Sequence, residues 1–278
     1  MFSNKMKISI LGFGNIGSAI GYGLVNAKML KPEDLTVTRK GKKFIDELNK
    51  EGFNALNDNK EAVRKNRIII LAVTPHQLNR LLNEIKDVVT EEHIIISVVS
   101  GACIKQIKSK LNVSVSVIRV MPNTAIAISE SMTCIAAEDA DNEAIELTKK
   151  IFNAVGQTIE ISEDLMGSAT ALCACGLAFF LRAVRAASQG GIEIGFHSEE
   201  ALFMAAQTAK GAAAMLIKGG KHPESEIDKV TTPQGITISG LNEMEHNGFS
   251  SSMIKGIVIA AKKANKIYSN NGEKLSNE

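Results

Sequence analysis

The glycine-rich segment at residues 12–17 is the part of the sequence best suited to bind a phosphate. It follows an apolar run at residues 7–11 and opens a helical pattern that contains Ile20 and Leu24. Glycines at such a turn bring backbone N–H groups close to a pyrophosphate at the helix N-terminus. A purely structural turn is the alternative. The context favours a dinucleotide site that comprises Gly12, Phe13, Gly14, Asn15, Ile16 and Gly17.

Three polar residues after the second apolar run indicate which dinucleotide binds. An Asp or Glu at this position would bond to a ribose hydroxyl and repel a 2′-phosphate. The chain instead has Thr38, Arg39 and Lys40. Because a hydroxyl and two cations suit the additional phosphate, we expect NADPH as the preferred cofactor and weaker use of NADH. A solvated basic turn is the alternative interpretation.

Apolar runs alternate with helical patterns through the first half of the chain. This rhythm is typical of parallel β-α-β units. We expect strands at residues 7–11, 35–38, 67–73, 94–99, 113–120, 132–136 and 158–161. Four residues also recur at the spacing of one helical face, which predicts a helix packed on the sheet: Leu78, Leu81, Leu82 and Ile85.

The pattern changes after Ser162, where long segments rich in Ala and Leu begin. Residues 165–188 and 199–218 have strong helix propensity and are too apolar to be solvated on every side. We expect an α/β fold with an NADP-binding Rossmann-like domain at residues 1–161, followed by an all-α dimerisation and substrate-binding domain at residues 162–278. The apolar helices need a partner surface, which a second copy of the chain could provide.

The uncharged run at residues 165–181 is interpreted as a buried helix. It is shorter than the roughly 18 to 20 apolar residues of a membrane span. It also includes small and polar residues, namely Gly167, Ser168, Thr170 and Gly176.

The composition bounds the remaining possibilities. The formal net charge is +2, and the Lys and Arg residues are spread along the chain. The sequence therefore lacks the large basic cluster that is typical of a nucleic-acid-binding protein. The first residues lack a secretory signal, and we expect a cytoplasmic protein. No metal is expected, because the five His residues lack ligand spacing. Cys173 and Cys175 are expected to be reduced, buried thiols, and a redox switch is the alternative.

Several segments resemble the pyrroline-5-carboxylate reductase family and together nearly span the chain. Residues 71–75 are similar to the family's cofactor-binding strand end, and residues 119–124 read R-V-M-P-N-T, which matches its R-x-M-P-N-T signature. Residues 205–212 resemble the family's dimer-forming helix. Residues 232–237 resemble its S-P-G-G-x-T substrate loop.

The resemblance implies reduction of 1-pyrroline-5-carboxylate to L-proline, the last step of proline biosynthesis. It implies a homodimer with interlocked C-terminal helices, and a higher oligomer stays open. Each active site would combine one subunit's cofactor domain with its partner's loop. Implied cofactor contacts are Asn59, Ala72, Val73, Thr74, Pro75, Val98, Ser100 and Glu163. Glu163 could equally cap the helix that begins at Asp164.

The sequence departs from the family pattern at several positions. Thr74 replaces a usual Lys, Gln234 replaces a usual Gly, and Lys229 stands where an Asn is common. Residues 173–178 read C-A-C-G-L-A in place of S-G-S-G-P-A. These differences bear on fine substrate and cofactor preference rather than on the reaction class.

The loop at residues 232–237 contains the groups that an imine acid would require. Hydride transfer needs the imine held against the nicotinamide with its ring nitrogen protonated. The N–H groups of Gly235, Ile236 and Thr237 would bind the substrate carboxylate, and the Thr232 hydroxyl would assist. We expect Thr237 to relay the proton, directly or through water. An ordinary helix-cap role for Thr237 is the alternative.

Three other functions compete with this interpretation. A β-hydroxyacid dehydrogenase would carry a catalytic Lys early in the helical domain, where residues 176–188 contain Arg182 and Arg185 but no Lys. A reductase of a six-membered cyclic imine acid is a closer rival, because one methylene changes discrimination by only ~1–3 kcal/mol. A non-catalytic NADPH-binding sensor would keep the glycine loop while its substrate loop decayed, but Thr232, Gly235 and Thr237 are all present.

Overall fold

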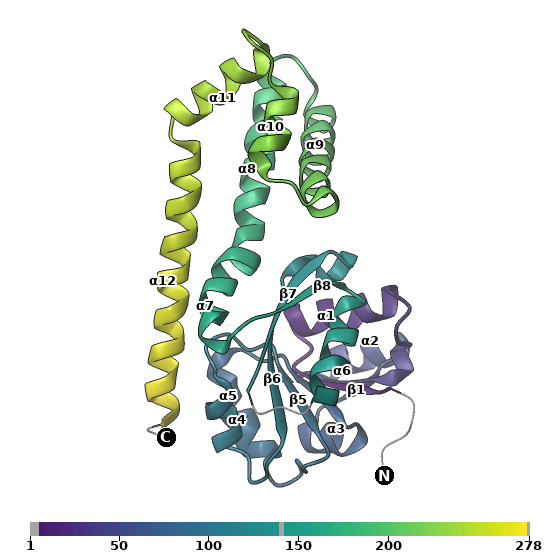
Figure 1. Cartoon of the computed structure of the whole chain (residues 1–278). Coiled ribbons are helices and arrows are strands. Elements are labelled where there is room, and N and C mark those ends of the chain that lie inside the picture. Colours follow the sequence, from purple (N-terminus) through teal and green to yellow (C-terminus); the bar gives the residue numbers. More distant parts are fainter. Residues whose placement is uncertain (1–5, 139–141, 277–278) are drawn as a thin grey trace. The chain divides into compact units, whose positions relative to one another are not determined.

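The computed structural model describes the backbone of residues 6–138 and 142–276 (Figure 1). The chain forms two compact units. One comprises Met1–Ala174 together with Ala260–Glu278, and the other comprises Cys175–Ile259. The predicted domain boundary between residues 161 and 162 falls directly after the last strand of the sheet.

The first unit is built on an eight-stranded sheet with the order β3-β2-β1-β4-β5-β6-β7-β8. Its strands are β1 (Ile8–Leu11), β2 (Leu35–Thr38), β3 (Asn54–Leu56), β4 (Ile68–Leu71), β5 (Ile94–Ser97), β6 (Ser116–Met121), β7 (Ser131–Ala137) and β8 (Gly156–Glu160). The predicted strands are confirmed within a few residues. The strand β3 was not predicted, because three residues are too few to show a pattern.

All neighbouring strands are parallel except β6 and β7, which are antiparallel. The connection between these two strands is short and contains only the 3-10 helix η2 (Thr124–Ile128). A parallel crossover needs about a dozen residues or more, so the short connection dictates the reversal.

Helices cover both faces of the sheet (Figure 1). One core contains residues of α1 (Asn15–Asn26), α2 (Lys42–Lys50) and α6 (Asn142–Asn153). The opposite core contains residues of α3 (Asn59–Lys65), α4 (Pro75–Ile85) and α5 (Ile104–Ser109). The predicted amphipathic helix is confirmed as α4, whose four periodic residues are all buried. The structure therefore has the layered α/β architecture that the sequence predicts.

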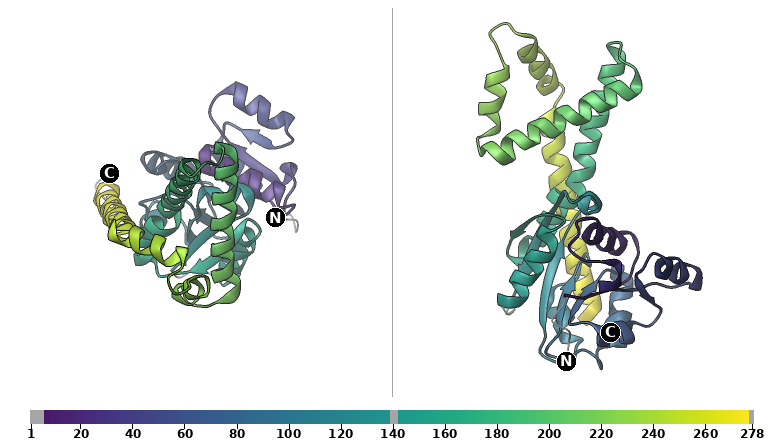
Figure 2. Two further views of the ribbon diagram at one scale, coloured as in Figure 1. Left: turned by 90° about the horizontal axis from the view of Figure 1, so that it is seen from above. Right: turned by 90° about the vertical axis from the view of Figure 1, so that its right-hand side faces the viewer.

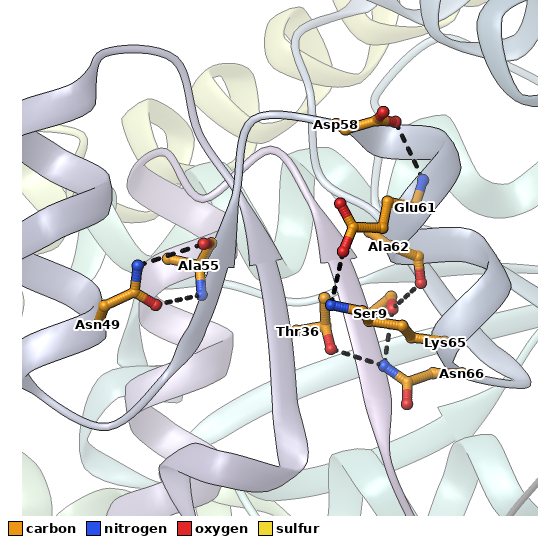
Figure 3. Close-up of polar contacts among 9 residues, drawn as sticks. All are labelled: Ser9, Thr36, Asn49, Ala55, Asp58, Glu61, Ala62, Lys65 and Asn66. Carbon is orange, nitrogen blue, oxygen red and sulfur yellow. Dashed lines mark hydrogen bonds and ion pairs between the residues drawn. The ribbon is translucent and has the colours of Figure 1, made fainter.

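A buried polar network joins β1, β2 and the end of α3 (Figure 3). The Asn66 amide donates hydrogen bonds of 2.9 Å to both Ser9 Oγ and Thr36 Oγ1. Ser9 Oγ in turn donates to the carbonyl of Ala62 at 2.7 Å. Because buried polar groups are costly unless they are paired, this network fixes the two strands and α3 in one arrangement.

The helical half begins with the short helices η3 (Glu163–Leu165) and α7 (Met166–Ala169) and a π-helical segment, η4 (Thr170–Cys175). It continues through α8 (Gly176–Glu193), α9 (Ser198–Gly219), α10 (Pro223–Val230), α11 (Ile236–His246) and α12 (Phe249–Ser276). Within the second unit, α8 and α9 pack against each other (Figure 2). The predicted change to an all-helical pattern is confirmed.

The prediction of a buried helix at residues 165–181 is wrong for the single chain. Phe180 and Leu181 of α8 have 59% and 62% of their surfaces exposed, so the part of the chain that the structure describes leaves this side of the helix uncovered. The segment Glu163–Glu193 is long and apolar enough to span a membrane by length and composition. One such helix is weak evidence of a membrane location, because helices packed against protein meet the same criterion.

Candidate active site

The loops that follow four parallel strands meet at one edge of the sheet. Leu11 at the end of β1 pairs with Thr38 on β2 and with Leu71 on β4, and Leu71 pairs with Ser97 on β5. The sheet extends from β1 in opposite directions through β2 and β4, which makes this point a topological switch. Ligands of open α/β sheets bind in the crevice outside the strand ends at such a point.

The three glycines of the phosphate loop have different surroundings. Gly12 has φ +99°, and a Cβ there would lie 2.8 Å from the carbonyl oxygen of Ala72. A Cβ at Gly17 would lie 2.2 Å from the carbonyl oxygen of Gly12, so only glycine lets α1 approach the loop. A Cβ at Gly14 would meet no protein atom within 4 Å. The backbone beside Gly14 at the start of α1 is therefore open, as the predicted pyrophosphate site requires.

Thr38, on the neighbouring strand β2, accepts two hydrogen bonds from this loop. Its hydroxyl accepts a hydrogen bond of 3.1 Å from the Gly12 N–H, and its carbonyl accepts one of 2.7 Å from the Phe13 N–H. Phe13 itself is buried, and its ring packs against Tyr22 and Phe53. The expectation that the Thr38 hydroxyl faces a 2′-phosphate is corrected, because the side chain is buried against the loop.

The two cations after β2 lie at the same edge as the glycine loop. The guanidinium of Arg39 stacks over the ring of Phe44 at 4.0 Å, and Lys40 is exposed. The amide nitrogen of Asn59, at the start of α3, donates to both carboxylate oxygens of Glu84 at 3.1 Å. The role of Asn59 near an adenosine phosphate stays a prediction.

Residues 72–75 connect β4 to α4 beside the glycine loop. A Cβ at Gly12 would lie 2.8 Å from Val73 Cγ1, which shows how closely the two loops pack. Thr74 is the N-cap residue of α4 and Pro75 is the first helical residue. The Gln77 side chain reaches back, and its Oε1 accepts hydrogen bonds from the N–H and the hydroxyl of Thr74. After β5, Val98 and Val99 are buried and Ser100 is half-buried.

Glu163 forms a buried ion pair inside the first unit. Its carboxylate accepts hydrogen bonds from Arg119 Nη1 at 2.9 Å and from the Ile104 N–H at 2.8 Å. The Arg119 and Glu163 side chains are only 4% and 11% exposed. Glu163 thus caps the start of α5 rather than the helix at Asp164. Its contact with the cofactor stays a prediction.

Asn123 is an organising residue that the sequence indicated only as part of a signature. Its amide nitrogen donates to the carbonyl of Cys173, and its amide oxygen accepts from the Ala125 N–H. Its own N–H donates to Ser131 Oγ. Asn123 therefore links the end of β6 to η2, β7 and the π-helical segment, which gives the R-x-M-P-N-T match a structural reason.

The thiols differ from the expectation of uniformly buried cysteines. Only Cys134 is buried, while Cys103, Cys173 and Cys175 are partly exposed, and all four are free. Cys173 faces Cys134 rather than Cys175, with the two sulfurs 3.7 Å apart. The hydrogen bond from Cys134 lowers the pKa of Cys173 to about 7. The pKa of Cys134 is raised by the same hydrogen bond and by burial.

The expected substrate loop lies in the second unit, at the start of α11. Gln234 has φ +57°, a conformation that favours the glycine usual in the family. A Cβ at Gly235 would lie 2.8 Å from the backbone carbonyl oxygen of Thr232, so glycine is favoured there. The Gly235 N–H donates to the Thr232 carbonyl at 2.9 Å. The Gly235 N–H is thus already bonded within the loop, which corrects the expectation that it binds the substrate carboxylate.

Comparisons with known proteins support the resemblance over both halves of the chain. A family model described as pyrroline-5-carboxylate reductase dimerisation matches residues 163–267. A model described as NADP oxidoreductase, coenzyme F420-dependent, matches residues 7–101.

Relatives match nearly the whole chain. Pyrroline-5-carboxylate reductase 2 of Dictyostelium discoideum is 51% identical over 95% of this chain and 93% of its own length. The chain spans 50% of the length of pyrroline-5-carboxylate reductase 1 of the same organism, at 52% identity. The chain belongs to the pyrroline-5-carboxylate reductase family. Membership confirms the predicted reaction class, an NAD(P)-dependent oxidoreductase.

Solved structures of the family have the same fold. The Plasmodium falciparum pyrroline carboxylate reductase, solved with NADP bound, aligns with a TM-score of 0.86 at 28% identity and covers 96% of this chain and 100% of its own. The Coxiella burnetii pyrroline-5-carboxylate reductase aligns with a TM-score of 0.87 at 27% identity and covers 95% and 99%. The predicted fold class, a Rossmann-type domain followed by a helical domain, is confirmed.

Proposed function

We propose that this chain reduces 1-pyrroline-5-carboxylate to L-proline with NADPH as the hydride donor. The single observation that carries the proposal is family membership over nearly the full length of the chain. The geometry of the glycine loop agrees with it, because the loop is closed where Gly12 and Gly17 pack and open beside Gly14. When bound, NADPH supplies the hydride that reduces the imine carbon.

The residues at the sheet edge would hold this cofactor. The N–H groups at the start of α1 would bind the pyrophosphate, since Gly14 leaves the helix terminus without a side-chain cap. Arg39 and Lys40 would bind the 2′-phosphate. Further contacts are proposed for the two loops after β4 and β5, from Ala72, Val73, Thr74, Pro75, Val98 and Ser100. Asn59 and Glu163 are less favoured, because other protein groups already bind their side chains.

The loop before α11 would bind the substrate. The N–H groups of Ile236 and Thr237 open this helix and would bind the carboxylate, and the Thr232 hydroxyl would assist. Gly235 contributes by its close approach to Thr232 rather than by its own N–H. The Thr237 hydroxyl would hold the proton at the ring nitrogen and so keep the imine carbon electrophilic.

The active form is proposed to be a cytoplasmic homodimer with interlocked C-terminal helices, in which each site combines two subunits. Supporting this proposal, α9 exposes large apolar side chains: Leu202, Phe203, Met204, Met215 and Ile217. Exposed large apolar side chains in this number are typical of a helix that packs against another protein chain. The dimerisation family model matches the same region.

The decisive experiment is an assay of the purified protein with 1-pyrroline-5-carboxylate, monitored by the absorbance of the reduced nicotinamide. We expect turnover with NADPH and slower turnover with NADH. Thr237→Ala should lower kcat by about 10²-fold, the lower end for a lost proton-transfer group. Thr237→Ser, which retains the hydroxyl, should recover most of the rate.

The six-membered cyclic imine acid is assayed beside the five-membered substrate. A higher kcat/KM for the larger imine would move the assignment to a homologous reductase. Cofactor binding without turnover of either imine would contradict the proposed function and indicate an NADPH-binding sensor.

A further inference from the structure

The turn between β2 and α2 carries an unusual concentration of positive charge. Within residues 39–43 only Gly41 is not cationic, and among the described residues none of the four cations forms an ion pair. Lys42 and Lys43 lie in the first turn of α2, which contains no acidic residue and has no side-chain cap. The positive end of a helix dipole disfavours cations, so this arrangement is stabilised when an anion binds.

Phe44 lies against the first and the middle residue of this turn. The Arg39 guanidinium carbon lies 4.0 Å from the centre of the Phe44 ring. Gly41 has φ +96°, and a Cβ there would lie 3.2 Å from Phe44 Cδ2. Phe44 is 44% exposed, so burial in the core does not account for its position. Both of these contacts are with residues of the cationic turn.

The framework around Phe44 is fixed to the sheet. The Arg39 N–H donates to the Leu56 carbonyl at 3.1 Å, which ties the cationic residue to β3. Near the other end of α2, Asn49 exchanges two hydrogen bonds with the backbone of Ala55, also on β3 (Figure 3). The strand β3 therefore holds both the backbone of Arg39 and the helix that carries Phe44.

Stacking suits an arginine that binds phosphate. The ring covers one face of the guanidinium and leaves its in-plane N–H donors open to an anion. A free Arg side chain would lose rotamer entropy on binding, and stacking removes part of that cost in advance. We infer that Phe44 is a positioning residue that aligns Arg39 for the 2′-phosphate of NADPH, an inference that rests on the proposed function.

The test measures binding rather than turnover. Adenosine 2′,5′-bisphosphate and 5′-AMP are titrated by calorimetry into wild-type protein and into Phe44→Leu, Phe44→Tyr, Arg39→Ala and the Arg39→Ala/Phe44→Leu double variant. Phe44→Leu should weaken binding of the bisphosphate about two- to fivefold, the range of an exposed cation–π contact, and leave 5′-AMP unchanged. Phe44→Tyr should bind as the wild type does. In the Arg39→Ala background, Phe44→Leu should add nothing.

The outcomes separate this inference from the proposed function. If wild-type protein binds the bisphosphate no better than 5′-AMP, the proposed NADPH preference fails, and the inference fails with it. If the wild type prefers the bisphosphate but Phe44→Leu retains that preference, only the role of Phe44 is overturned. Equal weakening of both nucleotides would also overturn it, because it would show a general structural effect. Steady-state KM values for NADPH and NADH should show the same selective change.

Discussion

At the scale of single residues, two glycines of the phosphate loop lack a side chain for opposite reasons. At Gly17 the position of a Cβ is already occupied by the carbonyl oxygen of Gly12. At Gly14 the position of a Cβ is open, and the residue is nevertheless glycine. Steric demands of the fold explain Gly17. For Gly14, whose Cβ position is open, we propose that the close approach of the cofactor to the backbone is the reason.

Alanine substitutions should separate these two reasons. Gly14→Ala should weaken NADPH binding by at least about tenfold and lower the free energy of unfolding by less than about 1 kcal/mol, because it disturbs only a helix cap. Gly17→Ala should lower the free energy of unfolding by about 1–3 kcal/mol, because the added Cβ collides with the backbone of Gly12. Calorimetric titration and urea unfolding measure the two effects. Equal loss of stability in both variants would contradict this explanation.

The pairing of Cys173 with Cys134 predicts a pH-dependent reactivity. Because the thiolate is the reactive form and the Cys134 hydrogen bond lowers the pKa of Cys173 to about 7, alkylation of Cys173 should rise with pH and be half-maximal near pH 7. Cys134→Ala removes the donor and should move this midpoint to higher pH. Peptide mass spectrometry after iodoacetamide treatment reports the rate, with Cys175 as the internal reference. An unchanged midpoint in Cys134→Ala would refute the assignment.

At the scale of elements, the Arg119–Glu163 ion pair connects β6, η3 and the start of α5. Glu163→Gln should lower the free energy of unfolding by about 3 kcal/mol, because it leaves a buried arginine without its carboxylate. The Arg119→Met/Glu163→Gln double variant should lose less stability, since it buries neither member of the charged pair. Denaturant midpoints and slopes measure both variants. A surface pair would behave differently, with a change below about 1 kcal/mol in both.

At the scale of the whole molecule, the exposed apolar side chains of α9 predict that activity depends on assembly. Phe203 is 72% exposed in the single chain. Phe203→Glu should shift the protein to monomers in analytical ultracentrifugation and abolish turnover, because each site is proposed to combine two subunits. Ile159→Glu, a half-exposed position on the edge strand β8, is the matched control and should stay dimeric and active. An active Phe203→Glu monomer would contradict the two-subunit site.

The sequence alone determined those features that depend on neighbours along the chain. The strand periodicity, the helical face of α4 and the glycine loop all follow from residues a few positions apart, whose spacing the backbone geometry converts directly into structure. The short strand β3 could not be predicted in this way, because its pairing with β2, rather than its own pattern, makes it a strand.

Only the tertiary structure decided which side chains meet across the fold. Cys173 faces Cys134 rather than Cys175, Glu163 pairs with Arg119, and the Thr38 hydroxyl serves the glycine loop. These partners lie tens of residues apart and carry no spacing signal. Strand order and helix packing bring them together, because the sheet must bury its apolar faces before such polar contacts can form.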